Sequence, residues 1–271
     1  MHFITFSRKM GTNGSEIARR VAERLGYNFY DTEAIESAAQ EMGFLKDVKE
    51  IDEKAPSLFL RFFSKSPEVH LDRLHSVIYE LASHGNAVFL GRGSHSLLRT
   101  FKCALHIRVI ASLAKRIENL VGRGWHREVA IKAIHRSDHE RGAFIKFAFG
   151  VDWDNPELYD LVLNTDNLTV GMAVNTVLHI ASSEEIKARS MDAVRSLEMM
   201  GLARRAEAAL IEAGLTHGPS ISVLEPGKIQ VTGFLVAETT KTKLEEILRR
   251  VRGIQSIDNQ VQVMTPYTGG G

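Results

Sequence analysis

The sequence predicts an α/β fold in which helices cover both faces of a parallel sheet, followed by a smaller unit of αββαβ order. Three observations predict it. Short apolar runs alternate with longer stretches of helical spacing up to about residue 181, two of these runs end directly in glycine loops, and the order of elements changes afterwards. Apolar strands separated by helices are typical of parallel sheets, whose ligand sites lie at the carboxyl ends of the strands.

Composition limits the classes of protein to which the chain can belong. With 271 residues, 44% hydrophobic and 25% charged, it is long enough for one large core plus a satellite unit. The net charge of +1 predicts no long-range field for nucleic acid or membranes, so an anion site must be local. Cys103, the only cysteine, lies in an apolar run and indicates a buried thiol. We expect no transmembrane segment and a cytoplasmic location, since the start of the chain does not resemble a signal peptide.

The first half begins with a buried strand over residues 3–6 and a helix that ends at Gly26. A short strand over residues 28–30 leads to Asp31, a predicted helix cap, and to a helix over residues 32–42. Residues 43–67 lack a clear period, which predicts an irregular segment that is either mobile or ligand-covering.

Three further strands, separated by helices, complete the predicted sheet. A helix over residues 68–84 precedes the strand 87–90, which runs into Gly91-Arg92-Gly93. After another helix, the remaining elements are a strand over residues 104–110, a helix through 120, a basic helix over 128–149 and a strand over 161–163.

The second unit follows a charged helical connection. We predict a helix over residues 203–213, strands over 220–224 and 229–233, a helix ending near 251 and a strand over 257–264. The predicted boundaries are 1–183 for the first domain, 184–196 for the connection, 197–266 for the second domain and 267–271 for a disordered tail.

The first glycine loop is the strongest candidate site. A glycine loop before a helix exposes backbone N–H groups that bind phosphate. The standard phosphate loop, G-x-x-x-x-G-K-[ST], needs a lysine where this chain has Ser15, followed by Glu16. Arg8 or Lys9 would then supply the positive charge from the other side of the loop. The alternative is that Asn13 and Glu16 only cap the helix and the glycines only turn the chain.

Arginines elsewhere extend this hypothesis. Arg92 follows a strand end between two glycines, a position suited to an inward guanidinium, although a solvated surface arginine is the alternative. Arg136 and Arg141 lie in the basic helix, which forms either a cationic lid or a solvated face. His135 and His139 share a helix face but have no third ligand, so we predict no metal site.

The order and spacing of several motifs over residues 2–181 resemble the cytidylate kinase-like family. These motifs are Ile4-Thr5-Phe6-Ser7-Arg8, Gly11-Thr12-Asn13-Gly14, Phe29-Tyr30-Asp31, Val88-Phe89-Leu90-Gly91-Arg92-Gly93, Asp138-His139-Glu140-Arg141 and Tyr159-Asp160-Leu161. The resemblance implies a three-layer P-loop kinase-like core that uses ATP and Mg²⁺ on a nucleotide substrate.

The same resemblance implies roles for single residues. Gly11, Thr12, Asn13, Gly14 and Ser15 would hold the donor phosphates. Asp31 would open the arm that binds the monophosphate, Arg92 would reach the acceptor phosphate, and Asp138 would contact substrate. Arg136 and Arg141 would close from the lid, and Ser15 departs from close relatives, many of which have arginine there.

The second unit resembles a BON domain. The resemblance rests on Ile221-Ser222-Val223, Gly227-Lys228-Ile229-Gln230-Val231-Thr232-Gly233 and the segment from Val251 to Asn259. Such domains bind partners rather than catalyse, so the implied partner is an unknown ligand or protein.

Two functions remain open from the sequence. One is phosphoryl transfer from ATP to a nucleoside monophosphate such as CMP. The other is a kinase-like protein without turnover that senses a nucleotide or another anion and is coupled to the BON-like domain.

Overall fold

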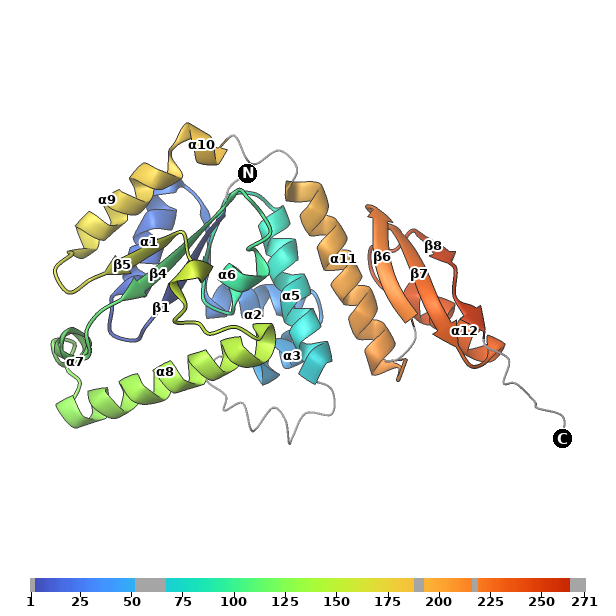
Figure 1. The fold of residues 1–271 in the computed structure, drawn as a ribbon, viewed down its shortest axis with the longest axis horizontal. Helices are drawn as coiled ribbons and strands as arrows, with labels where there is room; N and C mark the ends of the chain where they lie inside the picture. Colours follow the sequence, from blue (N-terminus) through green and yellow to red (C-terminus); the bar gives the residue numbers. More distant parts are fainter. Residues whose placement is uncertain (1–2, 52–66, 188–192, 216–218, 264–271) are drawn as a thin grey trace.

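The first part of the chain forms a five-stranded parallel sheet with strand order β2-β3-β1-β4-β5 (Figure 1). The structure is a computed structural model that describes residues 3–51, 67–187, 193–215 and 219–263. The strands are β1 (Phe3–Arg8), β2 (Asn28–Tyr30), β3 (Ala87–Leu90), β4 (Ala104–Ile110) and β5 (Leu161–Asn164). The parallel α/β fold predicted from the sequence is therefore confirmed.

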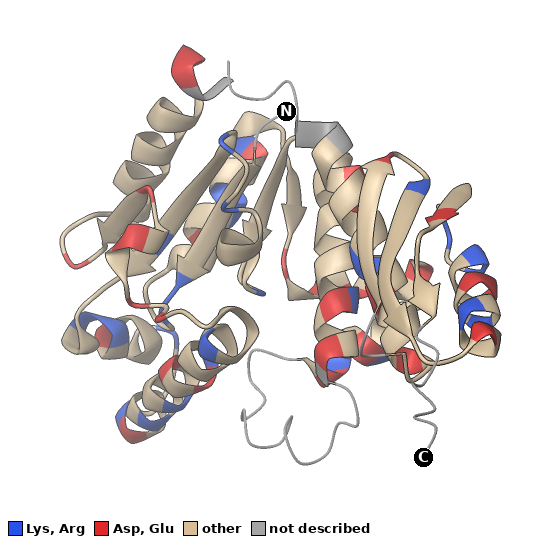
Figure 2. Ribbon diagram, turned by 45° about the vertical axis from the view of Figure 1, so that its right-hand side comes forward, with Lys and Arg blue, Asp and Glu red and all other residues tan. Residues whose placement is uncertain are grey.

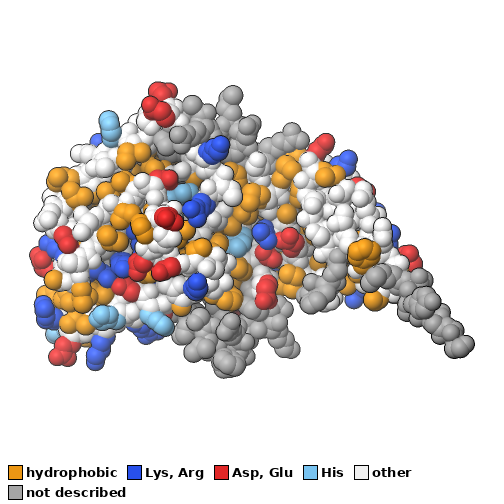
Figure 3. Space-filling view, viewed as in Figure 1, with side chains coloured by type: hydrophobic (Ala, Val, Ile, Leu, Met, Phe, Trp, Pro, Cys, Tyr) orange, Lys and Arg blue, Asp and Glu red, His pale blue; other side chains and the backbone are white. Residues whose placement is uncertain are grey.

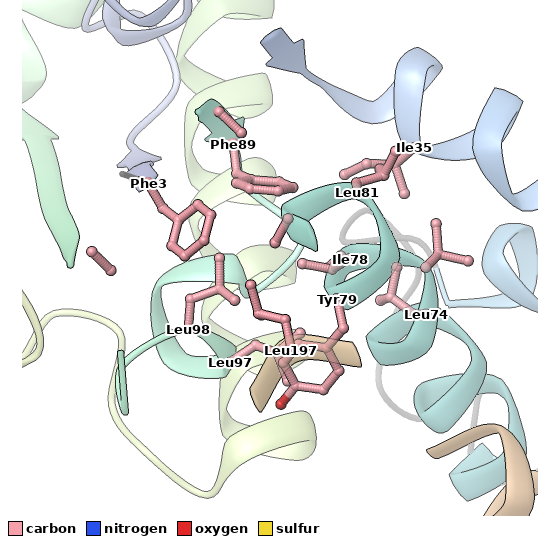
Figure 4. Close-up of a cluster of buried hydrophobic side chains, with 14 of the residues drawn as sticks. Phe3, Ile35, Leu74, Ile78, Tyr79, Leu81, Phe89, Leu97, Leu98 and Leu197 are labelled. Atoms are coloured by element: carbon pink, nitrogen blue, oxygen red, sulfur yellow. The ribbon is translucent and has the colours of Figure 1, made fainter. Parts of the chain in front are cut away.

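Alternating side chains of the central strands build two cores, one on each face of the sheet. Ile4 and Phe6 pack beneath α1 (Gly14–Leu25) and α9 (Val170–Ala181). Phe3 and Phe89 point to the other face, and Figure 4 shows them beside side chains of the helix α5. The helices that contribute to this second core are α2 (Thr32–Glu41), α3 (Leu45–Glu50), α5 (Pro67–Ser83), α6 (Ser94–Leu97) and α8 (Arg127–Phe149). The result is a three-layer arrangement.

Two further elements flank the sheet, at opposite ends of its strands. The helix α7 (Leu113–Val121) follows β4, and the 3₁₀ turn Pro156–Leu158 precedes β5. The predicted irregular segment over residues 43–67 is wrong in part, because α3 forms within it and buries Val48 and Ile51. The remainder of that prediction, residues 52–66, lies outside the described residues.

The second unit is a mixed sheet backed by two helices. Its strands are β6 (Pro219–Glu225), β7 (Lys228–Leu235), β8 (Ser256–Asn259) and β9 (Gln262–Val263). The strand β6 is antiparallel to β7, whereas β8 and β9 are both parallel to β7. The predicted single strand over 257–264 is therefore two short strands, with Val261 buried between them. The predicted tail, residues 267–271, lies outside the described residues.

One long helix joins the two units. The chain passes through α10 (Glu184–Lys187) to α11 (Ala193–Glu212), which begins ten residues before the predicted helix start at 203, and α12 (Glu238–Arg249) packs beside it. Leu197 of α11 lies in the core with Tyr79 and Leu97 (Figure 4), while Leu202 and Ala206 belong to the core of the second sheet. Because α11 is apolar on two sides, it lacks the single stripe by which an amphipathic helix is found in a sequence.

Charged residues of both signs are interspersed on the face shown in Figure 3. Figure 2 shows the same mixture along α8. Within the described segments, none of the helices has both the length and the apolar character that a membrane crossing requires.

Candidate functional site

The glycine loop, residues 9–14, lies between β1 and α1 at the carboxyl edge of the sheet. Two residues place its backbone in the left-handed region, Gly11 with φ 83° and Asn13 with φ 61°. A Cβ atom at Gly14 would lie 2.7 Å from Cβ of Arg8, and one at Gly11 would lie 2.7 Å from the carbonyl oxygen of Arg116. Both glycines are therefore required by close approach of the neighbouring chain.

The carbonyl groups of this loop are held by residues around it. Arg116 Nε donates to the carbonyl of Met10 at 2.6 Å, Asn119 Nδ2 to that of Gly11 at 2.8 Å, and Thr165 Oγ1 to that of Thr12 at 3.1 Å. The N–H groups of residues 11–13, by contrast, make no hydrogen bond to any residue that the structure describes. These fixed carbonyls and unused N–H groups are the arrangement that an anion-binding loop requires.

A cavity of about 280 Å³ opens on this loop. Four cationic side chains line it, those of Arg8, Lys9, Arg123 and Arg141, against the single acidic side chain of Glu16. Arg141 also donates to the carbonyl of Arg8 at 3.2 Å, which fixes α8 over the end of β1. The predicted residues Arg8, Lys9, Arg141 and the stretch from Gly11 to Ser15 are thus brought together.

The helix-cap alternative is wrong for the first helix. Asn13 stands at the N-cap position but its side chain makes no capping hydrogen bond, and Arg123 donates to its Oδ1 atom instead. The carboxylate of Glu16 pairs with Arg20 at 2.7 Å along the helix. The positive end of α1 therefore keeps its capacity for an external anion.

Lys9 is engaged at the edge of the cavity. Its amino group lies 3.0 Å from a carboxylate oxygen of Asp154. The same carboxylate accepts from the buried Arg108 at 2.6 Å, and Arg108 also donates to Ser7 and lies 3.9 Å from the ring centre of Trp153. Although burial raises the pKa of Asp154, hydrogen bonding to Lys9 and the charge of Arg108 hold it below its usual value.

Arg92 does not line this cavity in the described structure. The residue is 1% exposed and has φ 55°, so the solvated alternative is wrong. Its guanidinium donates to the carbonyls of Val48 at 3.2 Å and Ile51 at 2.5 Å, and to Glu36 at 3.0 Å. Arg92 therefore ties the end of β3 to the segment formed by α2 and α3.

The other predicted contacts are also engaged within the protein. Asp31 caps α2 by accepting from the N–H of Ala34 at 3.2 Å, as expected for a cap. Asp138 binds Arg116 through both oxygens, at 2.7 and 2.8 Å, so it supports the glycine loop through that arginine. Arg136 is 75% exposed on α8 and pairs with Glu140, which raises its pKa.

Three polar residues that sequence reasoning did not assign to the site support it most directly: Arg108, Arg116 and Asn119. A charged residue inside the apolar strand β4 was the available signal for Arg108. Arg116 and Asn119 contact the loop from 106 and 108 residues away in sequence, and helical spacing does not reveal such contacts. Among the described residues, no three His, Cys, Asp or Glu side chains gather into a group that would hold a metal ion.

Comparisons with known structures concern the fold alone. An uncharacterized protein from Eubacterium ventriosum shares the fold at a TM-score of 0.55, with 17% identity over 68% of this chain and 99% of that chain. A shikimate kinase from Bacteroides thetaiotaomicron is similar at a TM-score of 0.42, with 11% identity over 67% of this chain and 99% of that chain. A gluconokinase from Sinorhizobium meliloti is similar at a TM-score of 0.44, with 12% identity over 70% of this chain and 98% of that chain.

No curated protein matches the sequence. The sequence model of the cytidylate kinase-like family matches residues 3–167, which is more than half of the chain. The chain therefore belongs to the cytidylate kinase-like family.

Proposed function

We propose that the chain binds ATP with magnesium at the glycine loop and transfers the terminal phosphoryl group to a nucleoside monophosphate such as CMP. The observation that carries this proposal is the cavity of about 280 Å³ in which four cationic side chains face the unused N–H groups of the loop. Phosphoryl transfer depends on positive groups placed around the transferring oxygens.

The residues present fit a polyphosphate. The loop is kept open by Gly11 and Gly14, where a Cβ atom would collide with neighbouring atoms, and Arg8, Arg123 and Arg141 offer guanidinium groups for phosphate oxygens. Magnesium prefers phosphate oxygens and water as ligands, so the bound polyphosphate itself would supply most of its coordination. When bound, magnesium neutralises charge on the β and γ phosphates.

Arg8 and Lys9 replace the missing lysine in this proposal. Both residues line the cavity, but Lys9 reaches a phosphate only if its amino group leaves Asp154. On the acceptor side, Arg92 acts as a positioning residue that holds α2 and α3, and Asp31 fixes the start of α2. Asp138 positions the loop through Arg116.

A second candidate is a nucleotide or anion sensor without turnover. Two observations favour it: Ser15 stands at the lysine position, and both Lys9 and Arg92 are already bound to protein groups. In this case the loop cavity would bind a nucleotide, and α11 would carry the bound state to the second unit. We propose that this second unit, residues 197–266, is a BON-like binding domain.

Turnover and binding distinguish the two candidates. The full chain is assayed for ADP release with magnesium, ATP and each common nucleoside monophosphate, while its melting temperature is measured with the same ligands. Arg8→Ala and Arg92→Ala are compared with Arg24→Ala, which removes an exposed arginine at the far end of α1.

We expect turnover with CMP or a related acceptor, lost in Arg8→Ala and kept in Arg24→Ala. Nucleotide-dependent stabilisation without product would support the sensor instead. A chain that neither turns over nor is stabilised by any nucleotide would refute both.

A further inference from the structure

A second cleft lies between the two units, away from the glycine loop. Its volume is about 390 Å³, and an adjoining hollow of about 210 Å³ shares Met42, Phe44, Arg205 and Arg252 with it. One wall is the turn between α2 and α3, and the other is formed by α11 and the end of α12. The cleft therefore exists only because the second unit packs against the first.

The walls of this cleft carry an excess of positive charge. Four arginines line it, Arg73, Arg205, Arg250 and Arg252, whereas Glu80 and Glu212 are the acidic side chains of its two parts. Each carboxylate is already used by an arginine: Arg73 pairs with Glu212, and Arg205 lies 3.6 Å from Glu80.

Arg250 and Arg252 differ from Arg73 and Arg205, because they have no acidic partner among the described residues. Both are exposed, and neither forms an ion pair with any acidic residue in the part of the chain that the structure describes. Burial lowers the pKa of Arg205, and the charge of Arg252 lowers it further, against the opposing effect of Glu80. The guanidinium groups of Arg205, Arg250 and Arg252 therefore lie together with fewer negative charges than positive ones, and a bound anion would reduce their mutual repulsion.

The opposite wall is apolar. Met42 and Phe44 are half-buried against the first core, and the guanidinium of Arg73 covers the Phe44 ring at 4.3 Å from its centre. On the other wall, Ile247 of α12 and Val251 just after it add further apolar surface beside the arginines. A ligand that fits both walls has a flat or aliphatic portion on one side and an anionic group on the other.

We propose that this cleft binds an amphipathic organic anion about the size of a nucleoside monophosphate. Its anionic group lies on Arg205, Arg250 and Arg252, and its apolar portion lies against Met42 and Phe44. The site is separate in space from the glycine-loop cavity, because the two share no lining residue.

The cleft is connected to the first domain's acceptor-side segment. Phe44 is the N-cap residue of α3, and the carbonyls of Val48 and Ile51 at the other end of this short helix bind Arg92. A ligand that fixes Phe44 therefore restrains α3, and hydrogen exchange of residues 45–50 should slow when the ligand binds.

The test uses naphthalene-2-sulfonate as the probe, titrated into the full chain by calorimetry. Naphthalene-2-methanol serves as the uncharged comparator, and inorganic sulfate as the anion without an apolar portion. The variant is Arg250→Ala with Arg252→Ala. The matched control is Arg249→Ala, which removes an adjacent exposed arginine that pairs with Glu245 and does not line the cleft.

We expect one sulfonate to bind per chain, and at least about tenfold weaker binding in the double variant, the loss of one charge-assisted hydrogen bond. Arg249→Ala and Arg8→Ala should bind the probe as the wild type does, the latter because the glycine loop is a separate site. No binding at millimolar probe, equal binding of the uncharged comparator, an equal loss in Arg249→Ala, or a loss in Arg8→Ala would each overturn the proposal.

Discussion

His75 should make the first domain sensitive to mild acid. This residue of α5 is 7% exposed, stacks on Phe149 at 5.5 Å between ring centres, and has no hydrogen-bond partner for either ring nitrogen among the described residues. Burial, with a further effect of the Arg204 charge, lowers its pKa to about 3. The folded state therefore keeps the imidazole neutral under conditions where the unfolded chain binds a proton.

The sign and size of the effect follow from this difference in pKa. The contribution of the neutral His75 to the free energy of unfolding is fully present above the unfolded pKa of about 6.5. Below that pH the contribution falls by about 1.4 kcal/mol per pH unit, until the folded pKa is reached. Between pH 8 and pH 5 the predicted loss from His75 alone is about 2 kcal/mol. His106, whose pKa burial lowers to about 4, adds a similar dependence of its own.

Urea unfolding of the wild type and of His75→Leu at pH 8, 6 and 5 isolates the contribution of this residue, since His106 is present in both. We expect the free energy of unfolding of the wild type to fall by about 2 kcal/mol more than that of the variant over this range. His84→Leu, which removes an exposed imidazole just after the same helix, should keep the wild-type dependence. Identical pH dependence in wild type and His75→Leu would refute the reasoning.

Two further predictions concern the glycine loop. Gly11→Ala should lower the free energy of unfolding by about 2–4 kcal/mol, because it combines a strained positive φ with a contact at 2.7 Å to the Arg116 carbonyl oxygen. Gly26→Ala, at a positive φ but with open space around it, should lower it by about 1 kcal/mol. Thermal melts of both variants check this, and equal losses would contradict it. Asp138→Ala removes the carboxylate that pairs with Arg116, whose side chain is only 4% exposed. The free energy of unfolding should fall by about 2–3 kcal/mol, which is less than the loss for a fully buried ion pair because Asp138 is partly exposed. The exposed ion pair between Glu118 and Lys115 provides the control. Glu118→Ala should lower the free energy of unfolding by less than about 1 kcal/mol, measured like that of Asp138→Ala by denaturant unfolding.

The sequence predicted the sheet and the position of the glycine loop, because strand alternation and glycine spacing are local patterns. It did not predict which groups the polar residues contact. Arg92 was expected at a phosphate but binds the carbonyls of Val48 and Ile51, more than 40 residues earlier in the chain. A guanidinium satisfied by backbone carbonyls leaves no periodic signal, since its acceptors exist at every residue.

The supports of the loop escaped prediction for the same reason. Asp138 and Arg116 lie on neighbouring helices, and their pairing depends on how α7 and α8 cross. A sequence pattern specifies the face of a helix, whereas the partner on the next helix is specified only by packing.

The shared helix α11 makes the stability of the first unit depend on the second. A domain joined by a flexible tether can be lost, exchanged or duplicated without harm to its neighbour. Here Leu197 fills the first core while Leu202 and Ala206, on the same helix, fill the second. Loss of the second unit together with α11 would expose the apolar side of α5, and should therefore destabilise the first unit.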